Sequence, residues 1–502
     1  MKTILKTSTL IKDLFVSFLL ISAYFITRLI NIKILPIFTD EAIYSFWAQV
    51  ALHDPENRYI SLVDGKQPLF IWFAAISQHI IKDPLVATRL VSVFAGFGAL
   101  IGIYILAFKL FNKKTAIISA ILYITIPFTL FYDRLALFDS LLTMIGIYVV
   151  LLSVKMAKNP SLDIALLNGI SIGLGQITKS SANFFLYLLP FSLLLFSLKD
   201  GYQKIRILKW FLLSGVTFIL SFLIYNSLRL SPLFYIIAQK NLEFIRPIST
   251  VIKNPFEYFQ SNFYSIINWL VIYISIPLFL LFLLGAIYGL LKRNLKILYL
   301  IILILGPFMA ENVFNKVLYP RFILFYFPYI IIIIAYTVAI ALDKFPKYKY
   351  YLIALFIIIL LVPANNSFWL ITNPLKAKLP DAEAIQYRDD WPAGYGVEEV
   401  KNIIIKESQS QDVYIGTEGT FGLYPFALNI YFYGNEKVHI YSYWPVNVEN
   451  LPQQVIDFSK NHKTYFIYNF SQKPIIDKHA KLVAKFQKGN GNSYMRLYEV
   501  MP

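Results

Sequence analysis

The residues best suited to chemistry are ionisable side chains that stand beside long apolar runs. Three are acids, namely Asp40, Glu41 and Asp139, and five are cations, namely Lys66, Arg89, Arg134, Lys179 and Arg321. Such groups normally face a cavity or a partner, because burying them alone in an apolar setting is costly. Cations neutralise phosphate, and a carboxylate accepts the proton of a hydroxyl or an amine. The set therefore predicts chemistry on a phosphate leaving group and an acceptor.

Each of these residues also has a purely structural interpretation. Asp40 and Glu41 can occupy the first turn of a helix with Thr39 as its N-cap, since acids are favoured at the positive end of a helix. Lys66 stands two residues before Pro68 and can extend its amine along the membrane interface. Both interpretations are compatible with a chemical role, because a base at a helix start is held rigidly.

The other candidates have structural alternatives of the same kind. Asp133, Arg134 and Asp139 can form a local salt bridge at a helix junction, and Arg89 can pair with a carboxylate such as Asp40 or Asp139. Arg321, within Tyr-Pro-Arg-Phe, can anchor a span at the interface. Lys179 is the sharpest candidate, because it has no acid near it in the sequence and is predicted at the tip of a short hairpin.

Metal and cofactor chemistry have little support in the sequence. The chain has no cysteine, and His53 and His79 share one loop without a recognisable ligand spacing. We expect no cofactor and no metal, with a divalent ion as the alternative.

The composition predicts a membrane protein. Of the 502 residues, 57% are hydrophobic and 15% are charged, whereas soluble domains carry about a quarter charged residues. The net charge of +17 lies wholly within residues 1–371, because residues 372–502 hold 14 basic and 14 acidic residues. We therefore expect no nucleic-acid partner. We also expect the chain to have two parts, one in the membrane and one in water.

Eleven apolar segments in residues 1–371 are candidate membrane spans, since a helix needs roughly 20 apolar residues to cross a bilayer. They are 13–33, 84–108, 115–132, 135–154, 163–178, 181–198, 208–229, 268–291, 297–311, 321–342 and 350–371. Basic residues gather in alternate short loops, as at Lys113-Lys114 and Lys292-Arg293, which predicts that these loops and the N-terminus are cytoplasmic. The candidate site residues then fall on the outer side, in a multi-pass protein of the cell membrane.

Two outer loops are long, and a separate domain follows the last span. The loop 34–83 contains two aromatic-rich stretches, 41–52 and 67–81, expected to be helices lying in the membrane interface, and the second long loop is 230–267. Residues 372–502 alternate strands and helices, which predicts a small extracytoplasmic α/β domain. Its expected helices are 397–408 and 451–461, and its expected strands are 412–416, 437–442, 464–469, 481–486 and 494–500. The predicted fold class is mainly α, polytopic, with this C-terminal α/β domain.

Five short motifs occur in an order that we know from one group of enzymes. They are Asp40-Glu41, Lys66-x-Pro68-Leu69, Arg89-Leu-x-Ser92, Arg134-x-Ala136-x-x-Asp139-Ser140 and Gly173-Leu174-x-x-x-Thr178-Lys179. With the predicted topology, residues 30–330 resemble the GT-C glycosyltransferases of the protein O-mannosyltransferase and lipid A aminoarabinose transferase group. Arg321-Phe322 stands where many members have Arg-Tyr, and Ser-Ser-Ala follows Lys179 in place of the commoner Gly-Pro.

The resemblance implies an activity and a role for each candidate. Members transfer a sugar from a polyprenyl-phosphate donor on the outer face with inversion, and they use an aspartate of the first outer loop as base. Asp40 would then be the base, supported by Glu41. The donor phosphate would bind Arg89, Lys179 and Arg321, and the residues that orient the substrates would be Lys66, Arg134 and Asp139. The expected partners are the lipid-linked donor, membrane lipid and an acceptor that is a protein, a lipid or a glycan.

Two other classes of function remain as alternatives. A lipid or sugar transporter, or a flippase, would need ionisable residues at mid-membrane and often internal repeats, and neither is found in the sequence. A surface receptor or assembly protein would use residues 1–371 only as an anchor, which leaves the charges at the outer ends of the spans without a purpose.

Overall fold

The computed structural model describes residues 2–196 and 203–502, with side chains from residue 11 onward. The chain forms two compact units. The first unit comprises Met1–Ile30, Ser61–Phe70 and Val91–Ile371, and the second comprises Asn31–Ile60, Ile71–Leu90 and Thr372–Pro502. Most of the first long loop, 34–83, therefore groups with the C-terminal residues rather than with the apolar helices.

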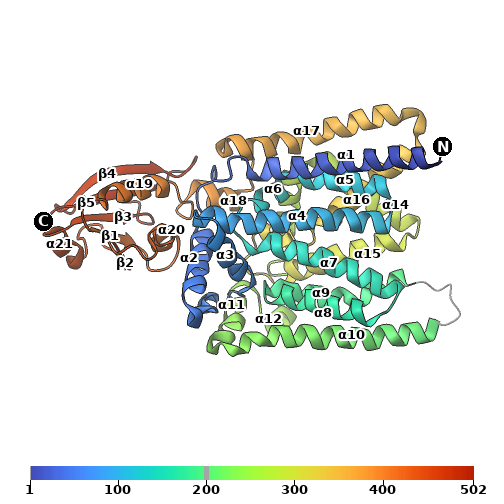
Figure 1. Cartoon of the computed structure of the whole chain (residues 1–502), viewed down its shortest axis with the longest axis horizontal. Helices are drawn as coiled ribbons and strands as arrows, with labels where there is room; N and C mark the ends of the chain where they lie inside the picture. Colours follow the sequence, from blue (N-terminus) through green and yellow to red (C-terminus); the bar gives the residue numbers. More distant parts are fainter. Residues whose placement is uncertain (1, 197–202) are drawn as a thin grey trace. The chain divides into compact units, whose positions relative to one another are not determined.

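The first unit is built of helices, the longest of which run side by side in Figure 1. Its first half contains α1 (Lys2–Leu29), α5 (Lys113–Thr125), α6 (Pro127–Asp133), α7 (Phe138–Lys158), α8 (Leu162–Gln176), α9 (Asn183–Leu188) and α10 (Gln203–Asn226). Its second half contains α11 (Ile236–Phe244), α12 (Ile248–Lys253), α13 (Phe259–Ile274), α14 (Ile276–Leu291), α15 (Leu295–Phe314), α16 (Phe327–Lys344) and α17 (Lys349–Thr372). Helices α3 (Leu69–Ile80) and α4 (Pro84–Leu110) have residues in both units.

Within the described residues, six helices are long and apolar enough to cross a membrane, or up to eight if each of two bent pairs is one span. The predicted count of eleven is not confirmed. The predicted spans 163–178 and 181–198 fall on the shorter apolar helices Leu162–Gln176 and Ser180–Leu195. Residues 197 and 198 of the latter prediction lie outside the described residues.

Both bent pairs break at a residue that cannot continue a helix. Ile126 is extended before Pro127, and α5 and α6 meet at 63°. Ser275 has φ +71°, and Pro277 opens the next helix, so α13 and α14 meet at 112°. A proline removes an amide donor and disfavours helical backbone in the residue before it. The predicted spans 115–132 and 268–291 are therefore each two helices.

The second unit contains a five-stranded sheet with the order β2-β1-β3-β5-β4. The strands are β1 (Val413–Glu418), β2 (Val438–Tyr443), β3 (Lys463–Tyr468), β4 (Ala480–Gln487) and β5 (Tyr494–Val500). Strand β1 pairs parallel with β2 and β3, while β5 pairs antiparallel with β3 and β4. All five strands lie within two residues of the predicted ranges.

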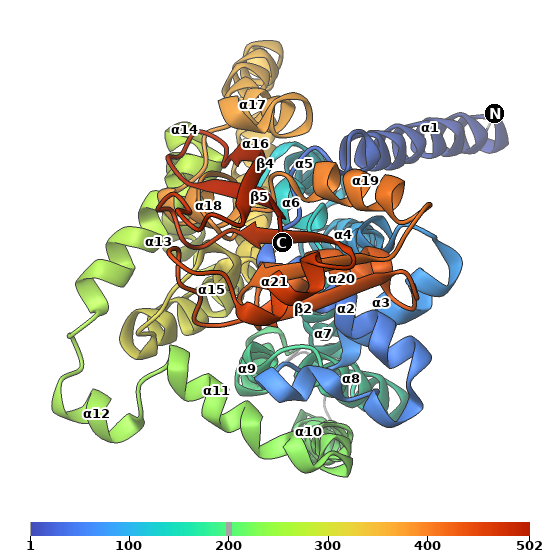
Figure 2. The ribbon, with the colours of Figure 1, turned by 90° about the vertical axis from the view of Figure 1, so that its left-hand side faces the viewer.

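Helices cover both faces of this sheet because side chains alternate along each strand. Tyr465 and Ile467 of β3 pack with α19 (Val397–Glu407) and α20 (Leu423–Phe432), whereas Phe466 and Tyr468 pack with α21 (Gln453–Ser459). Figure 2 shows α20 and α21 against the strands. Helices α19 and α21 were predicted from the sequence, and α20 was not. The mainly helical fold with a small C-terminal sheet domain is confirmed.

Helix α2 (Thr39–His53) belongs to the core of the second unit. Phe46 lies 5.0 Å from Phe426 between ring centroids, and Gln49 Nε2 donates to the Ile430 carbonyl at 2.7 Å. Both partners lie on α20. Phe46 and Gln49 thus pack on protein, and the expectation that the stretch 41–52 lies in the membrane interface stays a prediction.

Candidate functional site

Lys179 and Arg321 approach the same aromatic ring in the first unit. Lys179 Nζ lies 4.6 Å from the ring centroid of Phe322, and Arg321 Cζ lies 6.0 Å from it and 5.4 Å from the ring of Tyr319. Cations over aromatic faces are attracted by the electrons of the ring. Lys179 and Arg321, which are 142 positions apart in the sequence, therefore bring two positive charges to the same ring.

Lys66 joins this place through a second ring. Its Nζ lies 5.3 Å from the ring centroid of Phe244, which is 6.0 Å from that of Phe322. Phe244 ends α11, and its carbonyl accepts a hydrogen bond from the Lys316 amide at 2.8 Å. We call Phe244, Tyr319 and Phe322 the aromatic row. Three of the five cations predicted from the sequence, Lys66, Lys179 and Arg321, stand along it.

Hydrogen bonds of the backbone and of side chains join the loops that carry Lys66 and Lys179. The Leu69 amide donates to the Ile177 carbonyl at 3.0 Å, and Gln67 Nε2 donates to Ser180 Oγ at 2.7 Å. The Lys179 amide donates to the Gly175 carbonyl at 2.9 Å, at the end of α8. The motifs around Lys66 and Lys179 are thus neighbours in space.

Carboxylates hold two of these cations. Asp139, in the first turn of α7, is buried and accepts a hydrogen bond from Lys179 Nζ at 2.6 Å. Asp64 lies 3.9 Å from Lys66 Nζ and 2.8 Å from Lys240 Nζ. Burial lowers the pKa of Lys240, but hydrogen bonds to Asp64 and Glu243 outweigh it and raise that pKa above its ordinary value. Asp139 and Asp64 therefore fix the positions of the Lys179 and Lys66 amines along the aromatic row.

The side chain of Arg134 is enclosed by protein and bonds to the backbone. It is buried, and its Nη1 donates to the carbonyls of Thr27, Arg28 and Ile30 at 2.8 to 3.0 Å, beyond the end of α1. The local salt bridge with Asp139 that the sequence allowed is replaced by the pair of Asp139 with Lys179. Arg134 thus holds carbonyls at the end of α1, and its expected role in orienting substrate has no support from these contacts.

Asp133, next to Arg134, forms a buried network that sequence analysis did not assign. Its carboxylate accepts from Ser140 Oγ at 2.9 Å, Tyr24 Oη at 3.3 Å and Arg28 Nε at 3.4 Å. This network joins α1, α6 and α7, and it fixes the start of α7, where Asp139 lies.

Glu41 and Arg89 form a fully buried ion pair in the second unit. Arg89 Nε and Nη2 donate to the two oxygens of Glu41 at 2.8 and 2.7 Å, and the remaining donors reach the carbonyls of Ile32, Leu35 and Pro36. All five N–H groups of the guanidinium are used. Arg89 therefore has no donor left for a phosphate, and its partner is neither Asp40 nor Asp139.

Glu41 also fixes the start of α2. Its Oε2 accepts a hydrogen bond from the Phe38 amide at 3.0 Å, so the N-cap residue is Phe38 rather than the predicted Thr39. Thr39 is the first residue of the helix, and its Oγ1 donates to the Pro392 carbonyl at 3.0 Å. Asp40 follows in the first turn, half-buried, on a backbone that is held on both sides.

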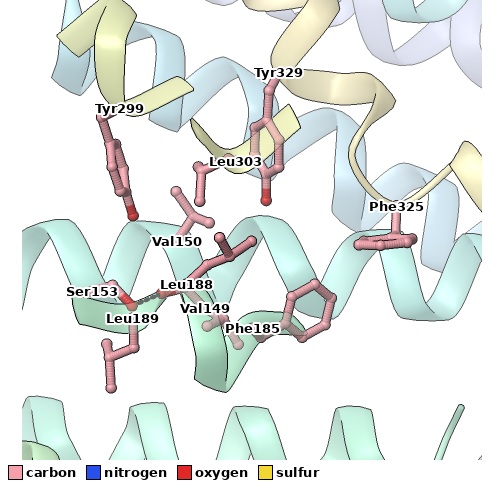
Figure 3. Close-up of a pocket in the computed structure, with 10 residues that line it drawn as sticks. All are labelled: Val149, Val150, Ser153, Phe185, Leu188, Leu189, Tyr299, Leu303, Phe325 and Tyr329. Carbon is pink, nitrogen blue, oxygen red and sulfur yellow. Dashed lines mark hydrogen bonds between the residues drawn. The ribbon is translucent and has the colours of Figure 1, made fainter. Parts of the chain in front are cut away.

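A mostly apolar pocket lies among α7, α9, α15 and α16 of the first unit. Figure 3 shows Tyr299 and Tyr329 on one side of it and Phe185, Leu188 and Leu189 on the other. Its polar groups are few, and Ser153 Oγ among them donates to the Val149 carbonyl at 2.7 Å.

Metal ligands do not gather in the described residues, where no group of three or more His, Cys, Asp or Glu side chains could hold an ion. The expectation that the chemistry needs no metal stays a prediction.

Sequence comparison supports the resemblance expected from the motifs. Residues 65–228 match the family model described as dolichyl-phosphate-mannose-protein mannosyltransferase. No curated protein sequence matches the chain. The matched range includes the motifs at Lys66, Arg89, Asp139 and Lys179, so the resemblance is confirmed over about a third of the chain.

Structural comparison finds the same fold in solved enzymes. ArnT from Cupriavidus metallidurans, solved with bound undecaprenyl phosphate, matches with a TM-score of 0.58 and 13% identity over 97% of each chain. The oligosaccharyltransferase of Archaeoglobus fulgidus matches with a TM-score of 0.50 and 13% identity, over 89% of this chain and 69% of its own. The same archaeal enzyme is also solved with an inhibitory peptide and a dolichol-phosphate, with a TM-score of 0.50 and 12% identity over 90% and 69%. The chain thus shares the fold of these membrane enzymes.

Proposed function

Starting from a fold shared with membrane enzymes that bind polyprenyl phosphates, we propose that this protein is an inverting glycosyltransferase. It takes a sugar from a polyprenyl-phosphate donor and transfers it to an acceptor on the extracytoplasmic face of the membrane. The observation that carries the proposal is the gathering of Lys66, Lys179 and Arg321 along the aromatic row. These cations come from three distant segments and stand in the unit that contains the apolar helices.

The donor phosphate is assigned to Lys179 and Arg321. A phosphate that leaves the sugar gains negative charge, and cations already in position stabilise that charge without a reorganisation step. Asp139 fixes Lys179 through a 2.6 Å hydrogen bond, so the amine is oriented before the donor arrives. The apolar helices of this unit provide surfaces for the hydrocarbon tail. Arg89 is left out of the phosphate site because Glu41 and three carbonyls use all of its donors.

The reaction that we propose is a single displacement. Asp40 accepts the proton of the acceptor hydroxyl, whose oxygen forms a bond to the anomeric carbon of the sugar. The bond between that carbon and the phosphate oxygen breaks, and the electron pair leaves with the polyprenyl phosphate. The configuration at the anomeric carbon inverts. Glu41 contributes by fixing the first turn of α2 on which Asp40 stands.

The test measures sugar transfer in membranes that contain the full-length protein, supplied with radiolabelled polyprenyl-phosphate sugars. Asp40→Asn is expected to lower transfer by at least 100-fold, as loss of a general base typically does, while donor binding persists. Arg321→Gln is expected to weaken donor binding. Arg229→Gln is the matched control, because Arg229 is also an arginine between helices of the first unit but contacts Asn226 and Phe234 instead.

Two results would refute the assignment. Full transfer by Asp40→Asn would remove Asp40 as the base, and equal donor binding by Arg321→Gln and Arg229→Gln would remove the phosphate site. Movement of lipid or sugar across the membrane without consumption of the donor would instead indicate a transporter.

A further inference from the structure

The start of α2 is paired with a segment from the other end of the chain. The Thr39 amide donates to the Pro392 carbonyl at 3.1 Å, and Phe38 and Ala393 form an antiparallel bridge. We call residues 390–395 the cradle. The cradle and the start of α2 both belong to the second unit. Thr39 and Pro392 are 353 positions apart in the sequence, so the first turn of α2 is held by a segment made much later.

Two more contacts fix this pairing. The Gly394 amide donates to the Ile37 carbonyl at 2.7 Å, and the ring centroid of Phe38 lies 4.3 Å from that of Tyr387. Phe38 is the N-cap of α2, and Asp40 follows it by two residues. Because the helix start is bonded to the cradle on both sides of its N-cap, the position of Asp40 depends on the position of the cradle.

A buried lysine donates hydrogen bonds to the cradle. Lys488 directly follows β4, and its side chain is fully buried. Its Nζ donates to the Ala393 carbonyl at 2.5 Å and to the Tyr395 carbonyl at 3.5 Å. Burying an amine is costly unless the protein supplies its hydrogen bonds, and lysine is almost never fully buried without a partner. Lys488 therefore bonds to the same cradle residue that pairs with Phe38.

The turn between β4 and β5 that carries Lys488 is itself fixed to the start of the cradle. The Asn490 amide donates to Asp389 Oδ1 at 2.9 Å, and Ser493 Oγ donates to Asp390 Oδ1. The Lys488 amide donates to the Ser493 carbonyl at 2.9 Å, which closes the turn. The amine is thus carried by a backbone with little freedom, and loss of its hydrogen bonds changes the cradle rather than the turn.

We propose that Lys488 is a positioning residue for sugar transfer, an inference that rests on the proposed role of Asp40 as the base. A general base works only within hydrogen-bond reach of the proton that it accepts, and a misplacement of about 1 Å lowers the rate roughly 100-fold. Glu41 fixes the first turn of α2 from within the helix. Lys488 fixes the same turn from the sheet, through Ala393. The C-terminal residues then contribute to turnover, although they hold none of the proposed reacting groups.

The experiment compares Lys488→Met with Lys485→Met in the full-length protein in lipid nanodiscs. Lys488→Met keeps a side chain of similar length but leaves two carbonyls of the cradle without this donor. Lys485 is the matched control, because it lies in the same hairpin but its Nζ stands 3.7 Å from the ring centroid of Tyr494. Hydrogen–deuterium exchange in peptides that cover residues 36–42 should rise about tenfold or more in Lys488→Met. It should not rise in Lys485→Met.

Transfer kinetics distinguish positioning from a purely structural role. The kcat of Lys488→Met, counted per donor-binding site, should fall about tenfold or more. The KM for the donor should change by less than about twofold, because the cations assigned to the phosphate lie in the first unit. A purely structural role would reduce the number of donor-binding sites and leave the turnover of each site unchanged. Where Lys488→Met gives no folded protein, Lys488→Gln, which keeps a donor on a shorter side chain, provides the same comparison.

Three outcomes would overturn the proposal. Residues 36–42 exchange equally in Lys488→Met and Lys485→Met, or exchange rises to the same degree in β1 and β3, or kcat per donor-binding site is unchanged. Asp40→Asn separates this inference from the proposed function. If Asp40→Asn lost transfer while Lys488→Met kept its full kcat, only the positioning role would be wrong. Full transfer by Asp40→Asn would instead remove the proposed base, and this inference with it.

Discussion

The buried pair of Glu41 and Arg89 predicts a large penalty when only one partner is removed. Arg89→Met leaves the Glu41 carboxylate buried without the guanidinium that neutralises it, while the hydrogen bond from the Phe38 amide stays. It also removes the donors of the Ile32, Leu35 and Pro36 carbonyls. Breaking a buried pair in this way costs about 3–5 kcal/mol. The loss of stability should be largest in residues 31–38, because Arg89 links their carbonyls to Glu41 at the start of α2 through hydrogen bonds.

The magnitude translates into a measurable opening of that segment. A penalty of about 3–5 kcal/mol corresponds to a change of roughly 10²–10⁴-fold in the equilibrium between closed and open segment. Hydrogen–deuterium exchange of the full chain in nanodiscs, read by mass spectrometry on peptides that cover residues 31–60, measures this equilibrium. Exchange in these peptides should rise by at least 100-fold, whereas peptides from β1 and β3 should keep their protection.

Lys33→Met provides a control in the same segment. Lys33 also forms ion pairs there, with Asp83 at 3.0 Å and with Glu398, but all three side chains are between 33% and 41% exposed. Exposed pairs contribute about 0–1 kcal/mol, so exchange should change by no more than roughly fivefold. The double variant Glu41→Gln/Arg89→Met removes both charges and should recover part of the protection. If Arg89→Met and Lys33→Met changed exchange equally, or if the two single changes at the buried pair were additive, the reasoning would be wrong.

Two further predictions concern stability. Burial lowers the pKa of Lys488 to about 7, so the unfolded chain holds more protons than the folded one between about pH 7 and 10.5. The free energy of unfolding should therefore rise with pH in this window, by up to about 1.4 kcal/mol per pH unit, and denaturant titrations of Lys488→Met should lose that slope. Gly96→Ala places a methyl carbon 2.3 Å from the Asp133 carboxyl group and 2.4 Å from Tyr24 Oη. It should lower the free energy of unfolding by about 1–3 kcal/mol, measured as a lower Tm in detergent, while Gly215→Ala, with nothing within 4 Å, should not.

The elements of the second unit could be predicted because their signals are local. The alternation Tyr465, Phe466, Ile467, Tyr468 identifies a strand with two buried faces, and the strand is found where it was expected. Helix α20 escaped prediction because Pro425 and the glycines before it are typical of a loop. The bend at Ser275 escaped it as well, since hydropathy is continuous across residues 268–291 and measures no direction.

The candidate site was predictable in its residue types but not in its pairings. The sequence identified Lys66, Lys179 and Arg321 as candidates for binding or orienting the substrates. The structure places all three along the aromatic row. Phe244 carried no signal, because a phenylalanine in an aromatic-rich loop has many possible partners. Arg89 was assigned to phosphate, yet it pairs with Glu41 from 48 residues earlier. Such choices depend on which surfaces the tertiary fold brings together.

The packing of α2 on α20 sets the order of events during synthesis. Gln49 leaves the ribosome 381 residues before Ile430, to which it donates a hydrogen bond in the finished structure. At about 5–20 residues per second, the early helix waits roughly 20–80 seconds for its partner. Throughout that interval the apolar face of α2 needs a temporary host, such as the bilayer surface or a chaperone. The helix that carries Asp40 is therefore among the first segments made and among the last to reach its final place.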